Sequence, residues 1–191
     1  MNNIASPWQR LLARSIDVAF LWLFPIFLIS IFSTSTDTVS MLNRLSLYVV
    51  LLIMVYPIVY IFLSSFLVSR FGGTVGKLAT GIKVVLADGQ LLSFWKAFFR
   101  DRIAYIVSGV LLWLGFIWIL VDKERRTWHD QIVDSYVVTG NKKLAFLGVV
   151  VLAAIIFLEF NLVSSAVSNF IKNGVVYKDV YDALISAFKT P

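Results

Sequence analysis

Asp17 is the residue whose type and position most clearly suggest chemistry. It lies just inside an apolar run, residues 16–32, in which Ser30 is the other polar residue. A carboxylate near the middle of a membrane costs roughly 2.5–3.5 kcal/mol even on insertion scales, so it usually faces the protein interior and pairs with a cation. Asp17 therefore indicates a functional site within a membrane-embedded part of the chain.

Two arginines and a second aspartate are positioned to form a charge network with Asp17. Arg14 precedes Asp17 by three residues, on nearly the same helix face and within side-chain reach. Arg10 lies two turns back on that face, roughly 10 Å along the axis, and Asp122 ends a later apolar segment at a similar level. This spacing allows Arg10 to pair with Asp122 while Arg14 pairs with Asp17. The same residues fit a structural salt-bridge lock, a solute or proton site, or a partner-binding site.

Four further residues are secondary candidates: His129, Asp130, Arg100 and Glu159. His129 is the only histidine, and with Asp130 and Asp122 nearby it has the chemistry for a metal ligand or a proton relay. A lone histidine in a basic loop is more often a cap or a hydrogen-bond partner, so we expect no metal and no cofactor.

Glu159 either marks the outer end of the last apolar segment or points into a cavity. No Ser-His-Asp or Cys-His arrangement has supporting context, and we expect no enzyme.

The composition is that of an integral membrane protein. Of the 191 residues, 59% are hydrophobic and 15% are charged, whereas soluble domains are usually about 45–50% apolar and about 25% charged. The chain has no cysteine, which excludes disulfides, zinc–thiolate sites and iron–sulfur sites. The net charge of +6 does not indicate nucleic acid, because the basic residues flank apolar segments, where they orient the chain and meet anionic lipid.

Four apolar runs predict membrane segments, since about 20 helical residues span a bilayer core of about 30 Å. They cover residues 8–32, 45–69, 103–121 and 144–158. Pro25 and Pro57 lie within the first two, and the fourth fades into a polar tail at Glu159 and Asn161. The first run also resembles a signal peptide, but Asp17 interrupts it and the cleavage signature is weak, which favours a retained helix. We expect an all-α membrane protein, a helical bundle of three to five membrane segments with a small cytoplasmic β element.

The basic residues predict the orientation of the chain in the membrane. Arg10 and Arg14 precede the first segment, residues 33–43 contain no Lys or Arg, and residues 70–102 contain six. Cytoplasmic loops carry an excess of Lys and Arg. The N-terminus and the second connection are therefore expected in the cytoplasm.

The third segment, from Ile103 to Val121, does not fit this simple pattern. Five basic residues follow it, within residues 122–143, so both of its ends look cytoplasmic. It is either one normal span at which the charge rule fails or a re-entrant hairpin broken near Ser108 and Gly109. Non-helical backbone at that depth is tolerated where it is buried in protein or lines a cavity. The side of the C-terminus stays open.

Two short stretches predict a small sheet on one membrane face. Residues 82–86 are apolar and β-branched, and the Asp-Gly pair at 88–89 is a strong hairpin-turn signal. Residues 132–133 and 136–138 form a second strand-like stretch that can pair with the first. Residues 94–100 alternate aromatic and basic side chains, which is typical of an interfacial helix.

The glycine-rich stretch at residues 72–77 is similar to a phosphate-binding loop but lacks two of its requirements. That motif has a glycine five residues before Gly76, where this chain has Phe71, and a Ser or Thr at the position of Leu78. We therefore expect no nucleotide binding. The glycines indicate tight turns beside the membrane.

Three motifs, in this order, resemble the RDD family of bacterial membrane proteins, which is named for one Arg and two Asp. They are residues 10–17, then 73–77 with 81–85 and 88–89, and finally 122–130 with 136–138. The resemblance covers about residues 6–139 and matches the family's Arg to Arg10 and its Asp residues to Asp17 and Asp122. This chain departs from the family pattern at Asp134 and Ser135, where a small residue and Thr are usual.

The resemblance implies one region and a role. Residues 1–140 would form an RDD-type membrane domain. Residues 141–191 lie outside the resemblance, and their own pattern predicts an additional membrane helix and a polar tail with amphipathic spacing at 175–188. The implied role is transport, with cation/proton exchange suggested for some members. The chain would then cross the bacterial cytoplasmic (inner) membrane several times, with the lipid bilayer, monovalent cations and protons as its partners.

The alternative is a non-transporting accessory or scaffolding subunit, bound to another membrane protein or to further copies of itself. A polar cavity leading to Asp17 would favour transport. A dry, fully paired Asp17 together with a large exposed apolar face would favour the accessory role.

Overall fold

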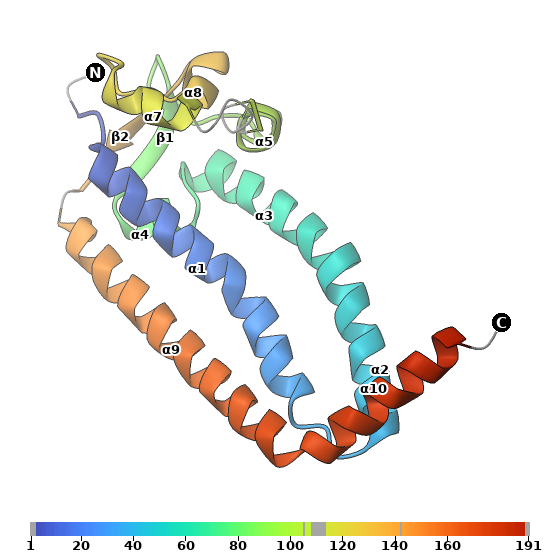
Figure 1. Ribbon diagram of the computed structural model, residues 1–191. Helices are drawn as coiled ribbons and strands as arrows, with labels where there is room; N and C mark the ends of the chain where they lie inside the picture. The colour runs from blue at the N-terminus through green and yellow to red at the C-terminus, as the bar shows by residue number, and fades with distance from the viewer. Residues whose placement is uncertain (1–2, 105, 108–113, 142, 190–191) are drawn as a thin grey trace. The chain divides into compact units, whose positions relative to one another are not determined.

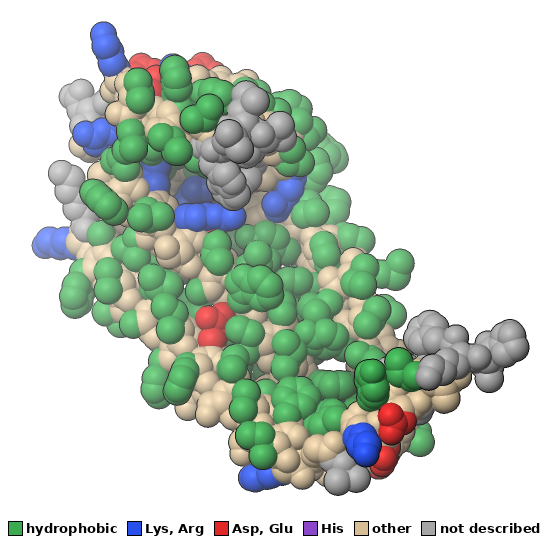
Figure 2. All heavy atoms as spheres, viewed as in Figure 1, with side chains coloured by type: hydrophobic (Ala, Val, Ile, Leu, Met, Phe, Trp, Pro, Cys, Tyr) green, Lys and Arg blue, Asp and Glu red, His purple; other side chains and the backbone are tan. Residues whose placement is uncertain are grey.

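Long helices dominate this structure, a computed structural model that describes residues 3–104, 106–107, 114–141 and 143–189 (Figure 1). Three stretches in this part of the chain are long and apolar enough to cross a membrane: Pro7–Phe32 of 26 residues, Thr38–Ala79 of 42 and Leu144–Lys172 of 29. On the face shown in Figure 2, hydrophobic side chains predominate over the long helices. The prediction of an all-α membrane protein is therefore confirmed. Three of the four apolar runs lie in helices that are long enough to cross a membrane.

The third apolar run is described only in part. Its described elements are the π-helical turn η2 (Arg100–Ala104), α7 (Leu114–Ile117) and the 3-10 turn η3 (Trp118–Leu120). Ser108 and Gly109 lie outside the described residues. Whether this segment spans the membrane or re-enters therefore stays a prediction.

The chain forms two compact units, which are described in turn. The first consists of Met1–Phe20 and Val59–Ala153, and the second of Leu21–Ile58 and Ala154–Pro191. Helices α1 (Pro7–Phe32), α3 (Tyr56–Phe71) and α9 (Leu144–Lys172) each contribute to both units. The division into residues 1–140 and 141–191 follows the extent of the family resemblance and of the last apolar run, and it stays a prediction.

In the second unit, helix α9 is longer than its apolar run. It continues through Glu159 and Asn161 to Lys172, so the expected end at Leu158 was wrong. The amide of Asn161 donates to the carbonyl oxygen of Phe157 (2.7 Å), which satisfies this polar group within the helix itself. The following helix, α10 (Gly174–Lys189), contains the amphipathic stretch. The apolar side chains expected on its face, at positions 176, 180, 184 and 188, lie outside the described residues.

The polar tail also caps the C-terminal end of α1 within this unit. The last carbonyls of a helix have no partner of their own. Asn173 and Tyr177 donate to the carbonyl oxygen of Ser33, at 3.3 and 3.0 Å. Arg44, on α2 (Thr38–Val50), donates to the carbonyl oxygen of Ile31 at 2.8 Å. These contacts give the tail a structural role that its sequence did not indicate.

The first unit contains the expected two-stranded sheet. Strand β1 (Ile82–Leu86) pairs antiparallel with β2 (Ser135–Thr139), with Val84 opposite Val137. The Asp-Gly turn is confirmed, because Gly89 adopts φ +85° and donates its N–H to the carbonyl oxygen of Leu86. Residues 132–133 are not part of the second strand, since they end the short helix α8 (Trp128–Ile132).

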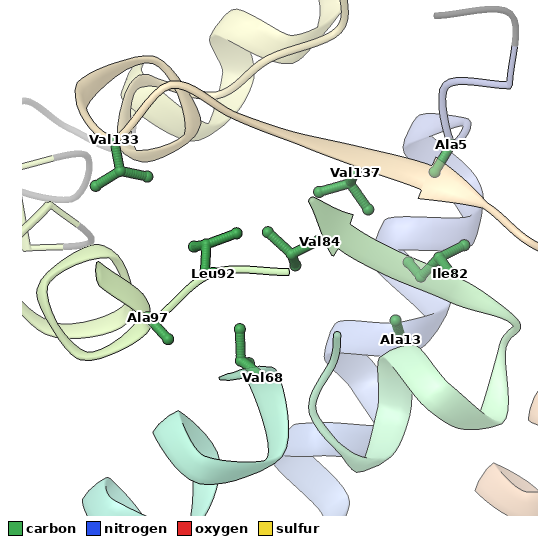
Figure 3. Close-up of a cluster of buried hydrophobic side chains, with 9 residues drawn as sticks. All are labelled: Ala5, Ala13, Val68, Ile82, Val84, Leu92, Ala97, Val133 and Val137. Carbon is green, nitrogen blue, oxygen red and sulfur yellow. The ribbon is translucent and has the colours of Figure 1, made fainter. Parts of the chain in front are cut away.

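A cluster of small and β-branched side chains packs this unit together (Figure 3). Its buried members are Ala5, Ala13, Val68, Ile82, Val84, Leu92, Ala97, Val133 and Val137. They come from α1, α3, both strands and α5 (Phe94–Phe99), the helix predicted to be interfacial, and from the stretches before α1, before α5 and between α8 and β2. The sheet thus anchors the elements that carry the candidate charges.

The glycine-rich connection lies directly against α1. Gly72 adopts φ +85°, and the short helix α4 (Val75–Ala79) begins soon after it. A Cβ atom on Gly76 would lie 2.0 Å from the carbonyl oxygen of Ala13. The glycine therefore permits a close backbone approach as well as the expected tight turn.

Replacing Gly76 by alanine is expected to lower stability by about 1–3 kcal/mol, because overpacking forces α4 away from α1. Thermal unfolding of the purified protein in detergent measures this loss. Gly174→Ala is the matched control, since a Cβ atom there meets nothing within 4 Å. Equal melting temperatures for the two variants would contradict the contact between Gly76 and α1.

Candidate functional site

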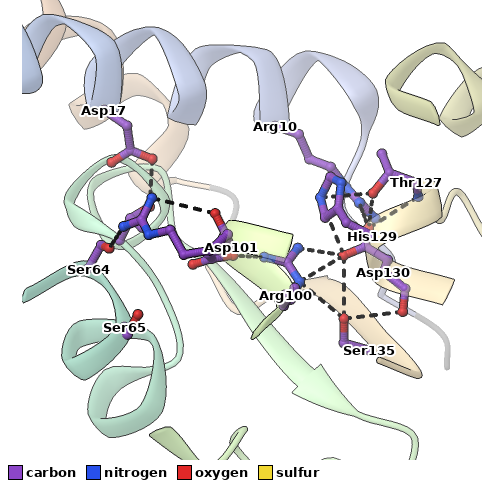
Figure 4. A network of polar contacts seen from close by, with 12 residues as sticks. Arg10, Asp17, Ser64, Ser65, Arg100, Asp101, Thr127, His129, Asp130 and Ser135 are labelled. Atoms are coloured by element: carbon purple, nitrogen blue, oxygen red, sulfur yellow. Dashed lines mark hydrogen bonds and ion pairs between the residues drawn. The ribbon is translucent and has the colours of Figure 1, made fainter. Parts of the chain in front are cut away.

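Asp130 is the centre of a buried ion-pair cluster (Figure 4). Arg10 donates through Nη1 to Oδ2 of Asp130 at 2.8 Å. Arg100 donates to Oδ1 through Nη2 and through Nε, the latter at 3.2 Å. Asp130 has no exposed surface and Arg100 is only 2% exposed. One carboxylate therefore joins residues separated from it by 120 and 30 positions in the sequence.

Local structure fixes the direction of the Asp130 side chain. Thr127 and Asp130 form a capping box at the start of α8, in which the backbone N–H of Thr127 donates to Oδ2 of Asp130 (3.2 Å). The Thr127 hydroxyl also donates to Oδ2 of Asp130 (2.8 Å). Ser135, the first residue of β2, lies on the other side and accepts from Nε of Arg100 at 3.2 Å. Arg100 reaches the Asp130 carboxylate from a third element, the turn η2.

The cluster extends to Asp17 through alternating charges. Arg100 also pairs with its neighbour Asp101 at 2.6 Å. The charge of Lys77 interacts through space with both Asp101 and Asp17. The resulting charge network consists of Arg10, Asp130, Arg100, Asp101, Lys77 and Asp17. Its formal charges cancel, and both of its ends belong to α1.

The charges of the cluster hold one another ionised. Burial opposes the ionisation of Asp130, but Arg100 and Arg10 outweigh it and hold the pKa of this carboxyl well below its usual range. Burial likewise acts against the charge of Arg100, while Asp130 and Asp101 keep the pKa of the guanidinium above its ordinary value. The pKa of Asp101 is lowered by Arg100 in spite of burial. All three groups are therefore charged at neutral pH.

His129 adjoins the cluster and is neutral. Burial lowers its pKa to about 3, against the opposing charge of Asp130. Its Nε2 lies 2.9 Å from the Thr127 hydroxyl, which gives its own proton to Asp130. Because that hydroxyl has a single proton, the imidazole must donate through Nε2–H. His129 thus supports the Asp130 cluster as a hydrogen-bond donor.

Asp17 is held by the glycine-rich connection. The Thr74 hydroxyl donates to Oδ2 at 2.6 Å, and the backbone N–H of Gly76 donates to Oδ1 at 2.7 Å. Asp17 is 7% exposed, so this membrane carboxylate is covered by protein as expected. Both of these donors are neutral groups, and the positive charge of Lys77 acts on the carboxylate as well.

A cavity of about 20 Å³ adjoins the Asp17 carboxylate, which is room for about one water-sized group. Its lining residues are Asp17, Phe20, Tyr60, Leu63, Ser64, Leu67, Thr74 and Val75. Three of them carry hydroxyl groups, Asp17 carries the carboxylate, and the other four are apolar. Arg102 borders this site, because it donates to the Ser64 hydroxyl and lies 5.5 Å above the Tyr60 ring.

The pairing expected for Arg10 differs from the one observed. Arg10 pairs with Asp130 and not with Asp122. Asp122 instead accepts the backbone N–H groups of Glu124 (3.1 Å) and Arg126 (2.8 Å), which closes the loop before α8. The expected pairing of Arg14 with Asp17 stays a prediction.

The structure also changes the rank of the other candidates. Arg100 and Asp130, secondary in the sequence, are central to the cluster. Glu159 belongs to the second unit, where its Oε1 is covered and makes no hydrogen bond to the described residues. Lys77 and Asp101 were missed, although each is a charge beside an apolar or glycine-rich stretch. Among the described residues, no three His, Asp or Glu side chains gather as metal ligands would.

Comparison with known proteins assigns the sequence to a family. The sequence model of the RDD family matches residues 4–134. The chain is similar to two proteins of Bacillus subtilis (strain 168), both described as uncharacterized. The match to YckC is 31% identical over 144 residues, 71% of this chain and 86% of the relative. The match to YxaI is 39% identical over 70 residues, 37% of this chain and 45% of the relative, so the chain spans less than half of that protein. No solved structure matches.

Asp130→Asn is expected to destabilise the protein by about 3–5 kcal/mol, because it leaves Arg10 and Arg100 buried beside a neutral amide. Denaturant or thermal unfolding in detergent measures the loss. Asp122→Asn is the matched control. Its side-chain oxygen still accepts the two backbone N–H groups, and the loss should stay below about 1 kcal/mol. Similar losses for both variants would show that Asp130 is not the centre of the network.

Acid should weaken the fold through His129. Its pKa is about 3 in the folded protein and about 6.5 when unfolded, so between these values the unfolded chain binds the additional proton. Stability is then full above about pH 6.5 and falls by up to about 1.4 kcal/mol per pH unit as the pH is lowered. His129→Gln keeps a donor and removes this loss. Melting temperatures from pH 6.5 to 5 should therefore decline less in the variant, and parallel declines would contradict the assignment.

Proposed function

The chain belongs to the RDD family of membrane proteins, and on that premise we propose that it takes part in transport, exchanging a small monovalent cation for a proton at Asp17. The observation that carries the proposal is the buried Asp17 carboxylate beside a cavity with hydroxyl-bearing walls. An ionisable residue inside a membrane segment is a functional-site hypothesis by default.

The chemistry of the cavity wall fits a small hard cation. Carboxylate and hydroxyl oxygens are the ligands that such cations prefer, and Asp17, Tyr60, Ser64 and Thr74 supply both kinds. The volume of about 20 Å³ admits one ion without its hydration shell. A single carboxylate balances one positive charge, which favours a monovalent ion over Ca²⁺ or Mg²⁺, since those bind several carboxylates or retain water.

Competition at one carboxylate would couple the cation to the proton. A proton on Asp17 removes the negative charge that holds the cation, so the two occupy the site in turn. Thr74 and Gly76 donate to the two oxygens of the Asp17 carboxylate and hold it against the cavity. The Asp130 cluster does not take part in this exchange, because Arg10 and Arg100 already compensate its charge. Its role is to hold the site together.

The second candidate is a non-transporting accessory or scaffolding subunit. One observation favours it: the cavity is small and its wall is largely apolar, while every member of the charge network has an opposite charge beside it or acting on it. Such a network would serve equally as a lock that fixes the fold. An accessory subunit would then present its apolar helices to another membrane protein or to a second copy.

The proposal includes a location and an orientation. The three apolar helical stretches are consistent with several crossings of the bacterial cytoplasmic (inner) membrane. The basic residues around α1 and in the connection before η2 support a cytoplasmic N-terminus by the positive-inside rule.

Purified protein in liposomes should show pH-dependent flux of sodium, potassium or lithium that Asp17→Asn abolishes. The substitution keeps the shape of the side chain and removes the charge that both the cation and the proton require. A pH-sensitive dye inside the vesicles, read while cation is added outside across pH 6 to 9, measures the exchange.

Asp88→Asn is the matched control for this assay, because Asp88 is exposed in the turn after β1 and does not belong to the charge network. It should exchange like the unmodified protein. Folded protein that carries no flux of any of the three cations would overturn the transport proposal and favour the accessory subunit. Flux that survives Asp17→Asn would show that transport does not take place at Asp17.

A further inference from the structure

Pro25 interrupts the hydrogen bonding of α1. In a regular α-helix the N–H of residue 25 would donate to the carbonyl oxygen of Leu21, four residues earlier. Proline has no N–H, so Leu21 loses that donor. Within a membrane no water is present to replace it, and a neighbouring group must satisfy the carbonyl instead.

Tyr56 provides the missing donor. Its hydroxyl donates to the carbonyl oxygen of Leu21, and its ring stacks on Phe24, with centroids 5.0 Å apart and an interplanar angle of 27°. All three residues and Pro25 belong to the second compact unit. The side chain of one helix thus completes the backbone of another at the position where a proline has broken it.

The helix that carries Tyr56 is itself irregular at this point. Tyr56 follows the π-helical turn η1 (Leu51–Val55), and its own N–H donates to the carbonyl oxygen of Leu51, five residues earlier. Pro57 comes next and also lacks an N–H. Such π-helical turns and prolines are where helices bend. The Tyr56–Leu21 contact therefore joins the weakened turns of two helices.

We propose that Tyr56 and Pro25 form a latch on a hinge in α1. The Tyr56 hydroxyl takes the place of the amide that Pro25 lacks, and its release lets the C-terminal turns of α1 bend at the proline. The stacked rings of Phe24 and Tyr56 guide the hydroxyl back to the Leu21 carbonyl. This inference is independent of the proposed transport role, because it rests only on backbone hydrogen bonding in the second unit.

A four-variant cycle with the full-length protein in detergent tests the latch: unmodified, Tyr56→Phe, Pro25→Ala and the double variant. Phenylalanine keeps the ring stack and removes the hydroxyl, so Tyr56→Phe should lower the melting temperature by about 2–4 °C. Pro25→Ala should raise it, because an alanine at this position has the N–H that donates to the Leu21 carbonyl. In the Pro25→Ala variant, adding Tyr56→Phe should lower the melting temperature by less than half as much as it does in the unmodified protein. Equal losses in both backgrounds would overturn the proposal.

Hydrogen–deuterium exchange separates a hinge from a general loss of stability. Tyr56→Phe should speed exchange several-fold at amides 26–32 of α1. In the double variant, Pro25→Ala should restore slow exchange at these amides. The control is Tyr48→Phe, since the Tyr48 hydroxyl makes no hydrogen bond within the described part of the chain. Its exchange pattern should match that of the unmodified protein. Unchanged exchange at amides 26–32 in Tyr56→Phe would contradict the hinge.

Discussion

The buried Asp130 carboxylate is the constraint on which the first unit depends. A charge with no exposed surface is tolerated only when it is paired and hydrogen-bonded, and Arg10 and Arg100 must both reach it. These partners come from the start of α1 and from the turn η2, so one side chain fixes two elements against α8 and the sheet. Replacing such a cluster by apolar groups often costs little. The Asp130 cluster therefore acts mainly by fixing the relative positions of α1, η2 and α8, and adds little to the free energy of unfolding.

A second attachment makes that arrangement specific for α1. Arg10 and Asp17 are seven residues apart, about two turns and roughly 10 Å along one helix face. Arg10 binds the Asp130 cluster, and Asp17 binds Thr74 and Gly76 of the glycine-rich connection. A helix held at two points on the same face can neither roll nor slide without separating a charge from its partner. The bare backbone of Gly76 allows the second contact, because any side chain there would strike α1.

The sequence indicates the local features of this fold and not its long-range pairing. Apolar runs and strand patterns identify α1, α9 and β1, since burial and period appear within a few residues. Asp17 could be recognised because a membrane charge is costly wherever it points. The choice between Asp122 and Asp130 as the partner of Arg10 could not be made from spacing, because both lie in the short connection between η3 and β2. The Thr127–Asp130 capping box was the signal available, because it predicts a helix start at which the Asp130 side chain turns back toward Thr127.

The relative cost of the contacts decides where the protein can move. Breaking a buried ion pair costs about 3–5 kcal/mol, so motion that separates Asp130 from Arg10 or Arg100 is strongly disfavoured. Losing one neutral hydrogen bond costs about 0.5–1.5 kcal/mol, and the Tyr56–Leu21 contact is of this kind. Pro25 and the π-helical turn before Tyr56 have already weakened the backbone there. A conformational change should therefore bend α1 at Pro25 and leave the Asp130 cluster intact. The buried charges hold the first unit in one arrangement, whereas α1 can bend at the proline in the second unit.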